Sequence, residues 1–183
     1  MAKYVAGSET STQACWYLLC SAPGATAAGT YTRFLLSTDD AGMGLSWDTE
    51  DVNYACEKAA VTVMNSVKWE KTGVVEKIVT TENTRGKTVS DFLNGLFANA
   101  ISGDADTSNY QTWVIYSDLE GASGTAKACL CTIQISSKTA TAGEKRGFEF
   151  DINPVGDPVA VTITAEAVDS TTNEIQVTAS MPT

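Results

Sequence analysis

Apolar and polar residues alternate along much of the chain, which predicts strands rather than helices. Val161 and Ile163, and again Ile175 and Val177, recur with the two-residue period of a half-buried strand. Val, Thr and Ile are also abundant where the alternation is imperfect, and these residues favour pleated, half-buried surfaces. The segments expected to be strands are 14–21, 31–38, 59–69, 74–81, 110–117, 126–136, 146–153, 159–167 and 174–179.

One segment has the period of a helix, over about residues 89–102. Thr88 is expected to cap its start, Asp91 to lie in its first turn, and Gly103 to adopt the left-handed conformation after its end. The residues that form its apolar stripe are Val89, Phe92, Leu93, Leu96, Phe97, Ala100 and Ile101.

The opposite face of this helix carries small and polar residues where surface helices usually carry Lys and Glu. These residues are Ser90, Asn94, Gly95, Ala98 and Asn99. We therefore interpret Ser90, Asn94 and Asn99 as candidate contacts with a second packed neighbour, such as another subunit. The alternative is an ordinary helix with an undistinguished outer face.

The segments 126–136 and 146–153 are expected to form a hairpin with two different faces. Its apolar face is predicted to carry Cys129, Cys131, Ile133, Ile135, Phe148, Phe150 and Ile152. Its polar, acidic-leaning face is predicted to carry Thr132, Gln134, Ser136, Glu149 and Asp151. An antiparallel sheet with one face in solvent has this pattern, and so does a sheet that lines a water-filled channel.

Proline and glycine mark the breaks between these elements. Pro154 and Pro158 predict a sharp break after the hairpin. Residues 39–51 contain Gly42 and Gly44 and are expected to be a long acidic loop. The chain is interpreted as one domain, 1–183, with a strand pair and acidic loop in 1–55, a core in 56–165, and a last strand and tail in 166–183.

Composition narrows the functional classes. The chain has 183 residues, of which 43% are hydrophobic, and this is enough to form a genuine core. The formal net charge of −10 argues against nucleic-acid binding by clustered Lys and Arg. No apolar run approaches the roughly 20 residues needed to span a bilayer, and no secretory signal is expected at the start.

The sequence offers little catalytic chemistry. It contains no histidine, which is the usual base for a Ser or Cys nucleophile. It also lacks a G-x-S-x-G elbow and a Gly-rich phosphate loop, so we expect neither an enzyme nor a cofactor. Asp104 and Asp106 resemble the start of a calcium loop, but Asn109 and Ile115 occupy the positions of its Gly and Glu, which favours a solvated turn.

The five cysteines suggest no metal site. They have no zinc-site spacing and are interpreted as small buried residues, with a disulfide or metal role as the alternative. They are Cys15, Cys20, Cys56, Cys129 and Cys131.

The order of the predicted elements from residue 74 onward resembles the core of siphophage tail tube proteins. That family is related to the inner-tube proteins of contractile tails and type VI secretion systems. The resemblance covers about residues 55–165 and rests on the order of the elements. That order is the strand 74–81, the helix, the strand 110–117, the Gly-rich turn 121–124, and the hairpin that ends in Gly156-Asp157-Pro158.

This resemblance implies a mainly β protein: an antiparallel β-sandwich or barrel with one flanking helix and extended hairpin or loop arms. Six copies would form a ring, and rings would stack into a tube through which DNA passes into the host without specific binding. Such a protein belongs to the virion, in the phage tail, and is assembled in the host cytoplasm. Its partners would be other copies of itself and tail proteins such as the tape measure and the terminator, with no membrane.

The resemblance also suggests roles for two sets of residues. The polar face of the hairpin would line the channel, through Thr132, Gln134, Ser136, Glu149 and Asp151. The acidic loop would contact the next ring or subunit, through Asp39, Asp40, Asp48, Glu50 and Asp51. A negatively charged channel would not retain DNA, because phosphates are not attracted to it.

Two other hypotheses remain open from the sequence. The chain could be a different non-enzymatic virion or surface part, such as a head decoration or an immunoglobulin-like binding module. It could also be a carbohydrate-binding module or hydrolase that uses tryptophans as a sugar platform, although tryptophans are more often core or interface anchors. The candidate tryptophans are Trp16, Trp47, Trp69 and Trp113.

Overall fold

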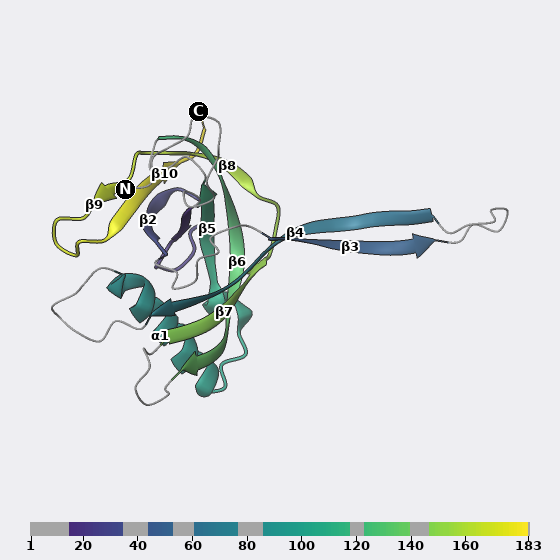
Figure 1. Cartoon of the computed structure of the whole chain (residues 1–183), viewed down its shortest axis with the longest axis horizontal. Coiled ribbons are helices and arrows are strands. Elements are labelled where there is room, and N and C mark those ends of the chain that lie inside the picture. The colour runs from purple at the N-terminus through teal and green to yellow at the C-terminus, as the bar shows by residue number, and fades with distance from the viewer. Residues whose placement is uncertain are drawn as a thin grey trace, which may run out of the picture.

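The computed structural model describes residues 15–34, 44–52, 61–76, 86–117, 123–139 and 147–182. Within these ranges, ten strands form one antiparallel sheet, accompanied by one α-helix and one short 3-10 helix, η2 (Thr107–Tyr110) (Figure 1). The mainly β fold with a flanking helix is therefore confirmed. The strands are β1 (Cys15–Leu18), β2 (Gly29–Arg33), β3 (Gly44–Val52), β4 (Val61–Glu76), β5 (Gln111–Ser117), β6 (Gly124–Thr139), β7 (Gly147–Pro154), β8 (Val159–Ile163), β9 (Ala167–Val168) and β10 (Ile175–Ser180).

Six of these strands form a closed circuit of hydrogen-bonded neighbours. The pairings run β6–β5–β1–β2–β10–β8 and return from β8 to β6, all antiparallel. This cyclic pairing is compatible with a small barrel, one of the two forms expected from the sequence. Each strand of the circuit has a neighbour on both sides, so its main-chain groups have no free edge along the paired residues.

The inside of the circuit is apolar. Cross-strand partners share a face of the sheet, and the pairs Tyr17–Ile115, Ala126–Val161 and Ile163–Ala179 are all buried. They belong to one hydrophobic cluster that also contains Tyr31 and Val177, which pair across β2 and β10. The last strand therefore completes the circuit and is part of the core.

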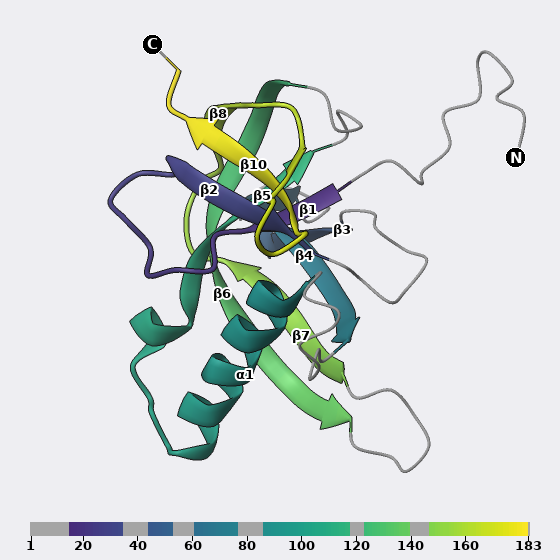
Figure 2. The same ribbon diagram turned by 90° about the vertical axis from the view of Figure 1, so that its left-hand side faces the viewer.

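A second hydrophobic cluster lies outside the circuit, beneath helix α1 (Lys87–Ile101). Leu93 and Leu96 of the helix pack there with Cys131, Phe148 and Phe150 of the sheet. Figure 2 shows the helix lying across β6 and β7. Strands β1 and β5 thus lie between two cores and are buried on both faces, which explains their imperfect alternation.

Helix α1 confirms the predicted segment to within about two residues, with differences at its start. The residue before it is Gly86, with φ of 81°, and no side chain of its own segment caps it. Thr88 is the second helical residue, so its predicted role as the cap is wrong. Asp91 lies beyond the first turn and pairs with Lys87 one turn earlier. Gly103 has φ of 79°, as predicted for the position after the helix.

A distant carboxylate replaces the missing cap. Glu174 lies in the loop before β10 and is 1% exposed. Its Oε1 accepts a hydrogen bond from the backbone N–H of Thr88 at 2.6 Å, and its Oε2 accepts one from the Thr88 hydroxyl at 2.5 Å. The first N–H groups of a helix have no partner within the helix, so this contact satisfies one of them. The loop before β10 therefore anchors the start of α1.

That loop is held by its own hydrogen bonds. Asp169 Oδ1 accepts hydrogen bonds from the backbone N–H groups of Thr172 and Thr171, each at 2.8 Å. These bonds favour the ionised carboxylate and lower the pKa of Asp169. Asn173 then adopts φ of 57°, the left-handed conformation that Asn tolerates, just before Glu174. The tight turn sets the position from which Glu174 reaches the helix.

Strands β3 and β4 correct two predictions. Asp48, Glu50 and Asp51 lie on β3, so residues 44–51 are a strand and not a loop, while Asp39 and Asp40 lie outside the described residues. Segments 59–69 and 74–81 were expected as two strands, but residues 61–76 form the single strand β4. The gap between the two predicted strands is where β4 changes its pairing partner: Glu70 pairs with β3, and Lys71 pairs with β7.

The pairing of β3 with the first part of β4 forms a two-stranded ribbon, here called the arm (44–52 and 61–70). Among the described residues no third strand pairs with β3. Figure 1 shows both strands leaving the rest of the molecule side by side. At about 3.3 Å per residue, the nine residues of β3 span about 30 Å.

Candidate assembly surface

Strands β6 and β7 present a polar face on the side away from α1. Thr132 pairs with Asn153, and Gln134 pairs with Asp151, so these side chains share one face of the sheet. Their neighbours Ile133 and Ile152 are buried on the other face. The structure therefore places Thr132, Gln134, Glu149 and Asp151 together, as the sequence predicted. Gln134 and Glu149 are exposed, and Thr132 and Asp151 are half-buried.

A β-bulge changes the pattern beyond Ile135. The register shifts between Ile135 and Ser137, and Ser137 becomes the partner of Glu149. The Ser137 hydroxyl donates to Glu149 Oε2 at 2.6 Å. Ser136 is exposed but has no partner in this register, so Ser137 is the residue of this face that the sequence analysis missed. A bulge inserts one residue into one strand and reverses the alternation after it.

The same bulge places Lys138 on the side of the helix. Its Nζ donates to Asn94 Oδ1 at 3.0 Å, and lies 5.0 Å from the ring centre of Phe97 and 5.5 Å from that of Phe148. Lys138 pairs with Phe148, on the opposite face of the sheet from Glu149, so its positive charge does not lie on the polar face. The polar face therefore keeps its acidic character. Asn94, a predicted contact with another subunit, is already engaged within the chain.

The predictions for three other residues of helix α1 have different outcomes. Ser90 is 1% exposed within a single copy of the chain, so its prediction as an outer-face contact with another subunit is wrong. Ile101 was assigned to the apolar stripe but is the last residue of the helix and is 72% exposed. Asn99 is half-buried and lines a cleft of about 300 Å³ between the helix, the loop around Pro23 and η2.

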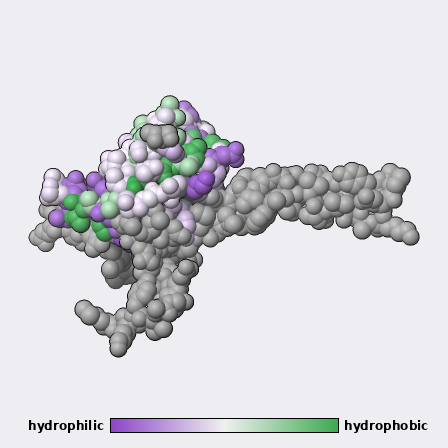
Figure 3. All heavy atoms as spheres, turned by 90° about the horizontal axis from the view of Figure 1, so that it is seen from above, coloured by the Kyte–Doolittle hydropathy of each residue, from purple (hydrophilic) through white to green (hydrophobic). Residues whose placement is uncertain are grey.

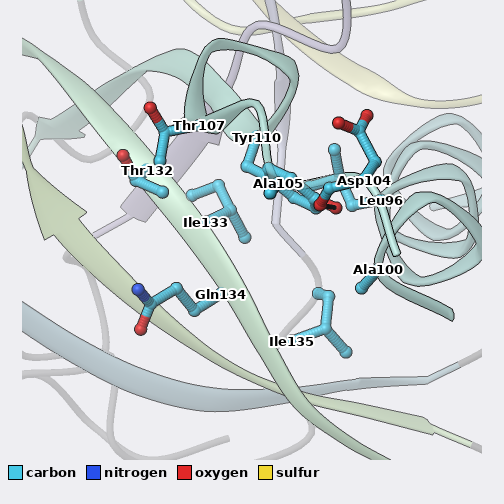
Figure 4. Close-up of a pocket in the computed structure, with 10 residues that line it drawn as sticks. All are labelled: Leu96, Ala100, Asp104, Ala105, Thr107, Tyr110, Thr132, Ile133, Gln134 and Ile135. Atoms are coloured by element: carbon cyan, nitrogen blue, oxygen red, sulfur yellow. Dashed lines mark hydrogen bonds between the residues drawn. The ribbon is translucent and has the colours of Figure 1, made fainter. Parts of the chain in front are cut away.

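A second cleft, of about 340 Å³, lies between the C-terminal half of α1, the turn that follows it and β6. We call it the edge cleft. Figure 4 shows Ile133 and Ile135 pointing from β6 toward the helix side, while Gln134 points the opposite way. The residues that line the edge cleft are Leu96, Ala100, Asp104, Ala105, Thr107, Tyr110, Thr132, Ile133, Gln134 and Ile135.

The two carboxylates of the turn beside this cleft accept hydrogen bonds from residues of the same turn. Asp106 Oδ1 accepts hydrogen bonds from the Ser108 hydroxyl at 2.8 Å and the Ser108 N–H at 3.0 Å, and these lower the pKa of Asp106. Asp104 Oδ2 accepts from Asn109 Nδ2 at 2.7 Å, and the Tyr110 hydroxyl donates to the Asp104 carbonyl. The part of the chain that the structure describes holds no group of three or more candidate metal ligands.

Three cysteines are described as free thiols. Cys129 and Cys131 are fully buried in the cluster beneath α1, which confirms their interpretation as small core residues. The hydrogen bond between the two thiols, together with burial, raises the pKa of Cys131, and the same bond lowers the pKa of Cys129. Burial, and secondly the charge of Glu174, raises the pKa of Cys20.

The structure describes the side chains of two of the four tryptophans, Trp16 and Trp113. Trp16 is 1% exposed and belongs to the core, so its role in a sugar platform is wrong. Trp113 is half-buried, and its indole N–H donates to the carbonyl of Gly24 at 3.2 Å. Trp47 and Trp69 lie on β3 and β4 of the arm.

The described surface is otherwise mixed. Figure 3 shows a face on which small hydrophobic areas are interrupted by hydrophilic residues. Among the residues whose burial the structure describes, the exposed large hydrophobic ones are Ile101, Val155, Val168 and Met181. None of the helices in the described ranges is both long and apolar enough to cross a membrane.

No protein-family model matches this chain, and no curated protein matches its sequence.

Proposed function

We propose that this chain is a structural subunit that assembles with copies of itself into stacked rings, as in a phage tail tube. Six copies would form each ring, and the stacked rings would enclose a channel for DNA on its way into the host. The subunit performs no chemistry and needs no cofactor. It belongs to the virion, is assembled in the host cytoplasm, and meets the tape measure and terminator proteins at the ends of its tube.

The observation that carries this proposal is the arm. A two-stranded ribbon is marginally stable in water unless it packs on something else. The arm extends from the molecule with only β3 and β4 paired along residues 44–52 and 61–70 (Figure 1). An element of this kind is suited to lie on a neighbouring molecule. Contacts of one arm with a different surface on the next copy are heterologous, and such contacts generate rings or filaments.

The polar face supports the channel part of the proposal. Glu149 and Asp151 lie beside Thr132 and Gln134 on the face of β6 and β7 that α1 does not cover. With a formal net charge of −10 and an acidic face turned inward, the channel would repel phosphates. DNA could then slide through without the counterion release that drives binding.

The test compares the full chain with a variant in which residues 44–70 are replaced by a short Gly-Ser turn. The full chain, concentrated and examined by sedimentation and negative-stain electron microscopy, should form hollow rings or tubes. The variant should remain monomeric with an unchanged melting temperature, because the closed circuit and both cores are intact. A full chain that stays monomeric at high concentration would contradict the proposal and favour a head decoration or an immunoglobulin-like module.

A further inference from the structure

One stretch of β6 has a strand neighbour on a single edge. On one side β7 pairs with β6 from Cys131 to Thr139. On the other side β5 pairs with it only as far as Thr132, opposite Gln111. From Ile133 onward, no strand in the described ranges pairs with this second edge. We call residues 133–139 on that side the open edge.

The main-chain groups on the open edge can be assigned from one hydrogen bond. The Leu130 carbonyl accepts from the N–H of Val155 at 2.8 Å, so Leu130 presents its main chain toward the side of β7 and β8. Main-chain groups of successive residues in a strand point to opposite edges. Ile133 and Ile135 therefore present their N–H and C=O groups to the open edge, ahead of the bulge.

The open edge lies beside the edge cleft. Ile133 and Ile135 line this cleft of about 340 Å³ together with Leu96 and Ala100 of the helix. Strand addition uses these two features together: free main-chain groups provide hydrogen bonds, and an adjacent pocket receives a side chain. The open edge and the edge cleft have the form of a site for an added strand.

We propose that strand β3 of a second copy adds to the open edge, with the face that carries Leu45 and Trp47 turned toward the edge cleft. In the arm, Leu45 pairs with Trp69 and Trp47 with Val67, so apolar residues share one face of the ribbon. Ser46, paired with Lys68, lies on the other face. This inference rests on the proposed function, since it names the contact that joins neighbouring copies.

The two partners match in faces and in length. β6 has an apolar side toward α1 and a polar side with Gln134, and β3 alternates in the same way near its start. When β3 of a second copy is paired with β6, Ser46 and Asp48 lie on the same side as Gln134 and extend the polar face of β6 and β7. The nine residues of β3 exceed the length of the open edge, and β3 pairs with β4 alone in the described chain. We therefore assign the outer edge of β3 as the edge that joins a second copy.

A photo-crosslinking experiment tests this contact on the full chain. A photoreactive phenylalanine analogue replaces exposed Thr107 at the cleft, or exposed Ala98 on the same helix but away from the cleft as a control. Chains labelled with ¹⁴N and ¹⁵N are mixed, assembled and irradiated. Mass spectrometry should find mixed-isotope crosslinks from position 107 to residues 44–52, and none to that segment from position 98.

A cleft-filling variant gives an independent measurement. Ala100→Trp places a large side chain at the cleft, and Ala98→Trp makes the same change on the exposed side of the helix. Ala100→Trp should raise the concentration needed for assembly at least about tenfold, which corresponds to about 1.4 kcal/mol. Ala98→Trp should leave that concentration unchanged, and both variants should melt like the wild type.

The outcomes separate this contact from the proposed function. Assembled particles whose crosslinks from position 107 lead to another segment, or are absent, would overturn the β3 contact and leave the tube proposal standing. Equal effects of the two tryptophan variants, or no effect of either, would also overturn it. A chain that never assembles would overturn both, and sedimentation before irradiation shows this directly.

Discussion

The contact between Glu174 and the start of α1 should be a main source of the helix's stability. The carboxylate is buried, receives two hydrogen bonds from Thr88, and lies at the positive end of the helix dipole. The helix has no cap from its own segment, because Gly86 precedes it. Glu174→Gln retains the size of the side chain and removes its charge, so it isolates this contribution.

The expected size follows from the geometry. Hydrogen bonds to a charged group contribute about 1.5–3 kcal/mol, and a carboxylate near a helix N-terminus about 0.3–1 kcal/mol. Because an amide still accepts one hydrogen bond, Glu174→Gln should lower the free energy of unfolding by about 2–3 kcal/mol. In a chain of this size that corresponds to a melting temperature lower by about 4–12 °C.

The assay is urea and thermal unfolding followed by circular dichroism. The control is Glu149→Gln, an exposed carboxylate on the polar face that accepts from Ser137, with an expected change of no more than about 0.5 kcal/mol. A double-mutant cycle with Thr88→Val should give a coupling energy of at least about 1 kcal/mol. Equal losses in the two glutamate variants, or full additivity in the cycle, would refute the tertiary cap.

Three further predictions concern the bulge, the β9–β10 turn and the thiols. Lys138→Ala should cost about 1–2 kcal/mol of unfolding free energy, through lost ring and amide contacts, while exposed Lys127→Ala should cost nothing measurable. Because the folded pKa of Asp169 is lowered, its contribution is present above the unfolded pKa and is lost as the pH falls through the folded value. The stability difference between wild type and Asp169→Asn should therefore shrink in acid urea titrations and vanish below that value; a constant difference would contradict this. Cys20 and Cys131 have raised pKa values and should resist iodoacetamide at about pH 8 until the chain unfolds, as peptide mapping would show; rapid labelling of the native protein would contradict this expectation.

Local periodicity was sufficient to predict the helix and the two-faced hairpin. Apolar spacing located α1, and alternation separated Ile133 from Gln134 because each strand there has one covered and one polar face. The closed circuit could not be predicted in this way. It depends on pairings between distant segments, such as β2 with β10, and on strands such as β1 that are buried on both faces.

The errors in the candidate site have tertiary causes. Ser90 is polar but buried, and Thr88 is bound by a carboxylate 86 residues away, which no local pattern reveals. The bulge near Ser136 exchanged the faces of the following residues without a signal in the sequence. Glycines and acidic residues suggested a loop at 39–51, but pairing with β4 makes residues 44–52 a strand.

Cryo-electron microscopy of the concentrated full chain tests the central claim most directly. The account predicts hollow tubes of stacked rings, with Glu149 and Asp151 facing the channel and the arm of each copy lying on a neighbour. Solid fibres, closed particles without a channel, or a tube whose channel is lined by the helix side of the subunit would contradict it.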